Sequence, residues 1–379
     1  MTQHLTEALR AKKIHPTDFS IRELAEAYMG REWVESLHPK HGMARPVLEA
    51  DGAAVALSDF GNITGQIFFN TVKEAYDNEE FVFSKLVPTR PSTIIDSMEK
   101  IPGISGVGDE FSVIGEGGEY PNFGVSEDYQ EISVKQKRGG LVPVTKEAVL
   151  GDRTGVLLDR AKSVGFYLGL NREKRIIDAL IDENAGAKSA ALGGHRYHWR
   201  GTTYATHQAT TPWVNVVSSN ALASWVSVES AWLKLAAIVD PFTQEPILIK
   251  PTHLVVTPQL EATAWRILHT TNVQTHFGGY ATSGTLQDQH APSPVAAVFG
   301  NLQIASSRLL AARAATDTDW WLSNPSKQCA YFSIWDVLTE EAPANNREMF
   351  HRDIVHIVKV SEMGCAATIE PRCTCESNA

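Results

Sequence analysis

The stretch DEFSVIGEGGEYPNFGVSEDYQEISVKQK, residues 109–137, contains the pattern that decides the fold. Phe111 and Val113 alternate with polar residues on its first side, and Ile132 and Val134 do so on its second, which predicts two strands. About a dozen residues rich in Gly, Glu and aromatic side chains separate them, far more than a tight hairpin needs. A two-stranded ribbon is marginally stable alone in water. We therefore expect an extended ribbon that lies on its own domain or on another subunit.

The glycines between these predicted strands allow two interpretations. A glycine-rich loop can bind phosphate, but a phosphate loop needs Lys followed by Ser or Thr, and a dinucleotide loop begins a helix. Here Pro121 follows the glycines, and Glu116 and Glu119 would repel a phosphate. We therefore interpret the glycines as positions that let the tip of the ribbon bend.

A long amphipathic helix is predicted downstream, over residues 153–183. Apolar residues recur along it at spacings of three and four, and Arg172 is the one polar break in that stripe. At 1.5 Å per residue this helix would be about 45 Å long, enough to support a whole domain. Its predicted polar face carries five basic residues, which are Arg153, Arg160, Lys162, Lys174 and Arg175.

Shorter helices and strands alternate irregularly through the rest of the chain. Helices are predicted at 61–81, 218–240 and 258–271, and strands at 82–91, 253–258, 296–307, 319–324, 329–337 and 353–362. Because strict strand–helix alternation is absent, the sequence favours an α+β fold over a doubly wound sheet.

The composition excludes several classes of protein. The 379 residues carry a net charge of −10, and an acidic chain without a Lys/Arg block is a poor candidate for binding nucleic acid by counterion release. An acidic wall can still enclose DNA and leave it mobile. No apolar run approaches the roughly 20 residues of a membrane span. The four cysteines form no disulfide framework, so we expect synthesis in a reducing cytoplasm.

Two groups of residues have some character of a metal site. His195 and His198 are suitably spaced, but no cluster of Cys or carboxylates accompanies them. The second group comprises His351, His356, Cys365, Cys373 and Cys375. Its C-x-C spacing is short for zinc, which favours free thiols on a C-terminal tail. No recognisable catalytic motif is present, so we expect no metal, no cofactor and no enzymatic activity.

Several motifs, in their order, resemble a known family. They are EGGEYP at 116–121, KRGGLVPVTKEAV at 137–149, DRTGVLLDRA at 152–161, HLVVTPQLEATAWRIL at 253–268, TDTDWWLSNP at 316–325 and HRDIVHIVKVSEMG at 351–364. Together they resemble the major capsid proteins of tailed bacteriophages, which have the HK97 fold. The likeness extends over roughly residues 55 to 365, and each motif alone is weak.

The chain is expected to have an α+β, HK97-like capsid fold with six segments. The first, at 1–54, lies outside the likeness; helical apolar spacing at 17–37 predicts a helical N-terminal extension, scaffold-like or ornamental. The resemblance implies the other five: an N-terminal arm at 55–107; an extended β-ribbon, the E-loop, at 108–140; a peripheral domain with a long spine helix at 141–214; an axial domain at 215–340; and a C-terminal return to the peripheral domain with a tail at 341–379.

The resemblance also implies a function and partners. Subunits of this family self-assemble through pentamers and hexamers into an icosahedral shell that encloses double-stranded DNA without sequence-specific binding. Implied partners are further copies of the chain and a portal protein, with scaffold, protease or decoration proteins in some members, and no membrane. The expected location is the virion, after assembly in the host bacterial cytoplasm.

Contacts between subunits are expected at the two ends of the ribbon. At the tip, Tyr120 and Phe123 would anchor on the adjacent subunit. Glu116 and Glu119 would meet basic residues there, such as Arg153 or Arg160 of a neighbour's spine helix. At the base, Lys135, Lys137 and Arg138 would face acidic partners.

Two other functions stay open at the level of the sequence. An encapsulin-type nanocompartment shares the fold but encloses protein cargo. A metal-dependent hydrolase would use His195 and His198 or the C-terminal cysteines.

Overall fold

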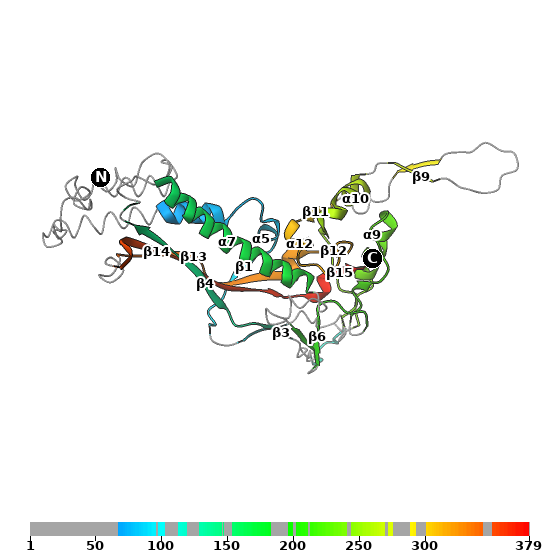
Figure 1. Cartoon of the computed structure of the whole chain (residues 1–379). Helices are drawn as coiled ribbons and strands as arrows, with labels where there is room; N and C mark the ends of the chain where they lie inside the picture. The colour runs from blue at the N-terminus through cyan, green and yellow to red at the C-terminus, as the bar shows by residue number, and fades with distance from the viewer. Residues whose placement is uncertain are drawn as a thin grey trace, which may run out of the picture. The chain divides into compact units, whose positions relative to one another are not determined.

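The computed structural model describes most of the chain beyond residue 66 (Figure 1). The described residues are 67–95, 98–102, 113–119, 129–145, 147, 154–182, 196–199, 202–210, 213–240, 244–269, 272–275, 289–292, 301–343 and 351–378. They contain both helices and sheets, and the predicted α+β class is confirmed. Two compact units can be distinguished, each assembled from separate parts of the sequence. Unit 1 takes its described residues from 1–81, 136–172 and 333–364, and unit 2 takes the rest.

A five-stranded sheet forms the centre of unit 2. Its strands, in spatial order, are β11 (Gln303–Ser306), β8 (His253–Val256), β12 (Trp320–Ser323), β15 (Thr374–Ser377) and β7 (Val216–Val217). β12 is antiparallel to both of its neighbours, whereas β11 is parallel to β8 and β7 is parallel to β15. β8 and β12 match the strands that the sequence predicts at 253–258 and 319–324, whereas β15 corresponds to no predicted strand.

Both faces of this sheet are covered. Leu254 and Trp320 lie in one apolar cluster with residues of α9 (Trp225–Ala236) and α10 (Pro258–His269). Their neighbours in sequence, Val255 and Trp321, lie in a second cluster with residues of α7 (Thr154–Ile181), α5 (Val82–Leu86) and α12 (Arg308–Ala311). Successive strand residues point to opposite faces. The sheet therefore has α9 and α10 on one face and α5, α7 and α12 on the other.

α7 confirms the predicted long helix, and its two halves differ in burial. The first half exposes one side, but from Arg172 to Ile181 every residue except Lys174 is buried. Arg175 was predicted to lie on the polar face, and this is wrong, because it is 6% exposed. Its Nη1 donates to the Tyr331 hydroxyl at 3.1 Å, and its guanidinium lies 5.4 Å from the centre of that ring. Among the helices that the structure describes, none combines the length and apolar character of a membrane span.

The predicted strand at 82–91 is wrong in its first half, where α5 forms instead. Glu173, fully buried on α7, accepts hydrogen bonds from the backbone N–H groups of Phe83 and Ser84 at 2.8 and 2.7 Å. It also accepts one from the Ser84 hydroxyl at 2.6 Å. These N–H groups belong to the first turn of α5. The N–H groups of a first turn have no hydrogen-bond acceptor within their own helix. A carboxylate from a distant helix therefore caps α5, and no local sequence signal announces it.

Unit 1 depends on the close approach of α7 to the helical segment 67–76. A Cβ at Gly165 would lie 2.3 Å from the carbonyl oxygen of Val72, and one at Gly169 would lie 2.6 Å from that of Tyr76. Glycine is therefore required at both positions by space. The Tyr76 hydroxyl donates to Glu362 Oε2 at 2.8 Å and accepts from Arg172 Nη1 at 3.1 Å. Arg172, the polar break in the predicted stripe, is thus part of a buried hydrogen-bonded group.

The remaining strands form three further sheets. One has the order β1 (Thr89–Pro91), β13 (Cys329–Pro343), β14 (Ile354–Thr368), β4 (Gln136–Thr145). Another has the order β2 (Glu99–Pro102), β3 (Tyr129–Ile132), β5 (Arg196–Trp199), β6 (Thr202–Tyr204), and β9 (Asn272–Thr275) pairs with β10 (Gln289–Pro292).

The ribbon predicted at 109–137 is only partly confirmed. β3 is a strand where the sequence predicts one, but it pairs with β2 and β5, so β3 is an interior strand of its sheet. Val113–Gly115, at the end of the first predicted strand, are not in a strand, and residues 109–112 lie outside the described residues. The alternating pattern identified β3 correctly, but an alternating pattern carries no information about which strands are its partners.

Residues 370–378 do not form the tail that the sequence suggested. β15 is an interior strand between β12 and β7, and the side chains before it are buried. Arg372 is 1% exposed and makes two hydrogen bonds to Glu370, from Nε at 2.6 Å and from Nη2 at 2.8 Å. Its Nη1 lies 3.7 Å from Asp240 Oδ1. Two carboxylates thus neutralise a buried guanidinium, as a buried charge requires.

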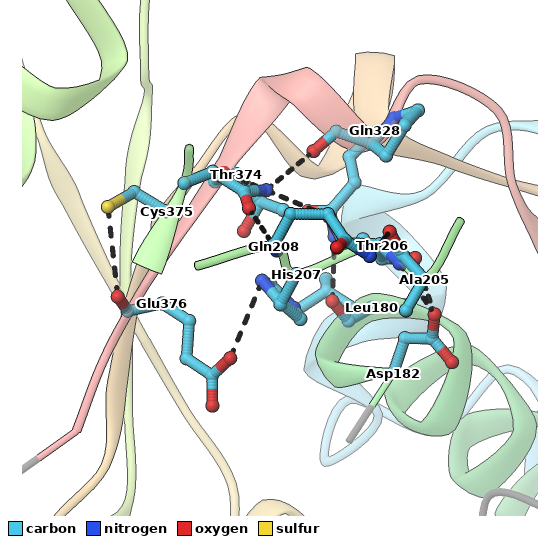
Figure 2. Close-up of polar contacts among 12 residues, drawn as sticks. Leu180, Asp182, Ala205, Thr206, His207, Gln208, Gln328, Thr374, Cys375 and Glu376 are labelled. Carbon is cyan, nitrogen blue, oxygen red and sulfur yellow. Dashed lines mark hydrogen bonds and ion pairs between the residues drawn. The ribbon is translucent and has the colours of Figure 1, made fainter. Parts of the chain in front are cut away.

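His207 is buried beside β15 (Figure 2). The side chain is 5% exposed, and Nδ1 lies 3.7 Å from Glu376 Oε2. Burial of the ring lowers the pKa of His207 to about 4, although the backbone of Ile181 acts in the opposite direction. Loss of hydration therefore dominates, and the imidazole is neutral at pH 7. Its neighbour Thr206 is fixed by Asp182 Oδ2, which accepts from the Thr206 hydroxyl at 2.5 Å.

Substituting Gly165 should reveal the close approach in unit 1. We expect Gly165→Ala to lower the free energy of unfolding by about 1–3 kcal/mol, because the added methyl group meets backbone that cannot move aside cheaply. Gly155→Ala is the matched control, since nothing lies within 4 Å of a Cβ there. The control should be neutral or stabilising by up to about 1 kcal/mol, because alanine favours a helix more than glycine does. Equal urea midpoints for the two variants would contradict the prediction.

His207 should make the chain less stable in acid. Because its pKa in the folded state is depressed to about 4, its contribution is complete above the unfolded pKa near 6.5 and is lost as pH falls from there to about 4. The loss from this group should be roughly 3 kcal/mol. Urea unfolding at pH 7 and pH 4.5 measures it, with His207→Gln as the comparison. The wild type should lose more stability than the variant over this range, and an equal loss would disprove the assignment.

Candidate assembly surfaces

The glycine-rich stretch forms a hydrogen-bonded turn. The backbone N–H of Gly118 donates to the carbonyl of Gly115 at 2.9 Å, and Gly117 has a φ of +81°. A positive φ at the third residue of such a turn requires glycine in practice. Glu116 and Glu119 are exposed, and Val113 is fully exposed. The turn therefore presents two carboxylates and one apolar side chain to the outside, whereas Tyr120 and Phe123 lie outside the described residues.

Lys135 was predicted to face an acidic partner on another subunit, and the structure contradicts this. Its side chain is fully buried, and Nζ donates to Glu99 Oε2 within the same chain. Glu99 also accepts from the Ser92 hydroxyl at 2.6 Å. Burial alone would raise the pKa of Glu99, but the hydrogen bonds from Lys135 and Ser92 and the charge of Lys135 together lower it. The charge of Lys135 is neutralised internally and is not available to a neighbour.

Lys137 and Arg138 lie at the start of β4 and remain candidates. Lys137 is exposed, and its Nζ lies 5.7 Å from the centre of the Trp335 ring. Arg138 is half-buried, and its Nη2 donates to Gln136 Oε1 at 2.6 Å. Both side chains have contacts inside unit 1, and these contacts hold their charges near the surface.

The exposed side of α7 places a basic residue between two apolar ones. Val156, Arg160, Ser163 and Tyr167 follow a four, three, four spacing, so they share one side of the helix. Val156 is 49% exposed and Tyr167 is 67% exposed. Arg160 is exposed between them, as predicted, whereas Arg153 lies outside the described residues. Tyr167 was not identified from the sequence as a surface residue. The signal was available, because Tyr167 lies seven residues after Arg160 and residues at that spacing share one side of a helix.

The residues considered for metal binding do not form a site in the described part of the chain. Among the described residues, no three His, Cys, Asp or Glu side chains are grouped to hold a metal. His198 is in β5, and His195 lies outside the described residues. Cys365, Cys373 and Cys375 form no disulfide and are buried. Burial raises the pKa of the Cys373 and Cys375 thiols to about 12, which keeps them protonated and unreactive.

Comparison with solved structures gives matches of low identity. The capsid of the cyanophage P-SCSP1u is 13% identical, with 79% of this chain and 88% of that chain covered and a TM-score of 0.45. The virus-like particle from Pyrococcus furiosus is 12% identical, with coverage of 82% and 99% and a TM-score of 0.42. The capsid of a native GTA particle is 9% identical, with coverage of 79% and 90% and a TM-score of 0.44.

A family model gives the decisive result. No curated protein matches the chain. The model described as phage capsid protein, in contrast, matches residues 128–376, which span β3, α7 and the five-stranded sheet except for its last residue, Ser377. This match covers more than half of the chain and confirms the resemblance drawn from the sequence motifs. The chain belongs to the phage capsid protein family.

Proposed function

We propose that this capsid protein is the major head protein of a tailed bacteriophage. It would assemble through pentamers and hexamers into an icosahedral shell around double-stranded DNA. The observation that carries the proposal is the family match over residues 128–376. The role is structural rather than catalytic, and the five segments implied by the sequence resemblance would take their HK97-type roles in the shell.

The charge of the chain supports enclosure of DNA rather than binding of DNA. A net charge of −10 repels phosphate, so the shell would confine the DNA while leaving it free to move. The candidate basic residues lie on different elements: Lys137 and Arg138 start β4, and Arg160 lies on α7. Sequence-specific binding would instead need a concentrated basic surface.

The acidic turn at 113–119 is proposed to dock on the α7 of an adjacent copy. Glu116 and Glu119 would face Arg160 of that copy, while the fully exposed Val113 would cover part of its Val156 and Tyr167. Each exposed ion pair is worth under about 1 kcal/mol. A shell repeats the same contact many times, so small pair energies sum to a large effect on assembly.

Electron microscopy of the purified protein tests the proposed function. We expect closed icosahedral particles, and particles made in infected or expressing cells with the packaging proteins should contain nuclease-protected DNA. Particles that contain protein cargo and no DNA under those conditions would favour an encapsulin-type compartment. A protein that stays monomeric at all concentrations and salts would refute the proposal.

Removing the carboxylates of the turn should weaken assembly. We expect Glu116→Ala with Glu119→Ala to leave a folded, soluble protomer but to lower particle yield, because the turn loses its charge attraction to Arg160. The difference from wild type should be largest at low salt, since salt screens exposed pairs. Particle yield is measured by sedimentation at several salt concentrations.

Glu74→Ala with Glu80→Ala is the matched control. Both residues are exposed, and this pair changes the net charge by the same amount. The control variant should assemble like wild type. Equal yields from both double variants at low salt would show that the turn does not take part in assembly.

A further inference from the structure

α9 and α10 carry large apolar side chains on their outer sides. Both helices cover the same face of the five-stranded sheet. Yet Val226 and Leu233 of α9 are 49% and 60% exposed, and Trp265 of α10 is 58% exposed. Single exposed apolar residues are ordinary. On α9 the two recur seven residues apart and so share one side of the helix, which is the pattern of a surface made for another helix.

The outer side of α9 is a narrow stripe with a charge at each edge. Val226, Ser230, Leu233 and Ala237 follow a four, three, four spacing. Glu229 lies at one edge of this stripe, and Lys234 lies at the other edge, five residues later. Both charged residues are half-buried, so their charged ends are next to the apolar stripe.

The outer side of α10 repeats the same pattern. Its stripe has the identical spacing and consists of Pro258, Ala262, Trp265 and His269. The rings of Trp265 and His269 are stacked, with their centres 4.7 Å apart and their planes inclined by 14°, so the tryptophan is held in one orientation. Glu261 lies at one edge of this stripe, and Arg266 lies at the other, again five residues later.

These two patterns are complementary when the helices run parallel. In a parallel helix pair, an edge residue meets the residue five positions further along the opposite edge of its partner. With Glu229 level with Glu261, Glu229 meets Arg266 and Glu261 meets Lys234. Leu233 is then level with Trp265. In the antiparallel arrangement the edges carrying Glu229 and Glu261 would meet each other, which places like charges together.

We propose that the outer stripe of α9 binds the outer stripe of α10 on a second copy of this chain. The inference rests on the proposed shell function and names the surfaces of one contact within it. The contact uses two different surfaces, so each copy binds one neighbour through α9 and another through α10. A contact of this kind generates a ring when its rotation closes.

Charge exchange tests the pairing. Glu229→Lys alone and Arg266→Glu alone should each lower the yield of rings or particles about tenfold or more, because each sets like charges together across the contact. The two substitutions combined in one chain should restore the yield, since every copy then presents a matched pair. Failure of the combined variant to recover, with its fold intact by circular dichroism, would refute the pairing.

Cross-linking tests the register. The native cysteines should react little with the cross-linker, because all four are buried. A chain carrying both Leu233→Cys and Trp265→Cys, treated with a short bis-maleimide after assembly, should give a ladder on a denaturing gel that extends beyond the dimer. Each single variant should stay monomeric. A strong dimer from a single variant would show that like helices pair and would overturn the proposal.

Leu248→Asp and Leu233→Asp separate this contact from the general function. Leu248 is 94% exposed and belongs to unit 2 but not to either stripe. Leu248→Asp should assemble like wild type, whereas Leu233→Asp should reduce assembly about tenfold or more. If Leu233→Asp assembles normally, this contact is refuted and the shell function stands. If wild type itself forms no particles, the proposed function fails instead.

Discussion

The five-stranded sheet must be covered on both faces, and most of the architecture of unit 2 follows from that requirement. Adjacent residues such as Trp320 and Trp321 are both fully buried, although they point to opposite faces. Such a sheet needs helices on both sides. The second half of α7 is therefore drawn into the core together with its charged residues. Burying those charges is costly unless each finds a partner.

The partners of these buried charges explain details that look unrelated. Arg175 is satisfied by Tyr331, and Glu173 is satisfied by the first turn of α5. Arg313 donates to Asp178 Oδ2 at 2.6 Å in the same way. The polar residues on this half of α7 therefore form buried hydrogen bonds that connect segments distant in sequence. The exposed side of the first half of α7 is the part of this helix that other molecules can reach.

Periodic elements could be predicted from the sequence, but their partners could not. α7, α9, α10, β8 and β12 were all anticipated from apolar spacing. The first half of the strand predicted at 82–91 is wrong, because Glu173, 90 residues away in sequence, caps a helix there. Lys135 was expected to face an acidic partner on another subunit, whereas in the structure it pairs with Glu99 of the same chain in the interior.

The candidate assembly surfaces also include residues whose exposure the sequence predicts and residues whose exposure it does not. The exposed positions of Glu116, Glu119 and Arg160 followed from local sequence, because turns and charged helix faces tend to lie at the surface. The sequence predicts the helices that contain Leu233 and Trp265, but it does not indicate that these two residues are exposed. Only the three-dimensional arrangement shows that the sheet leaves these two residues on the outside of their helices.

The place of β15 has a consequence for how the protein is made. This strand separates β7 from β12, although β7 belongs to a part of the chain synthesised much earlier. Ribosomes release sequence from the N-terminal side at a finite rate, so β7 must wait without its neighbour until Ser377 has emerged. Truncated products would lack a finished sheet and would present unpaired edges. The five-stranded sheet is therefore completed only after β15 has been synthesised, so this sheet folds late relative to the strands that precede it.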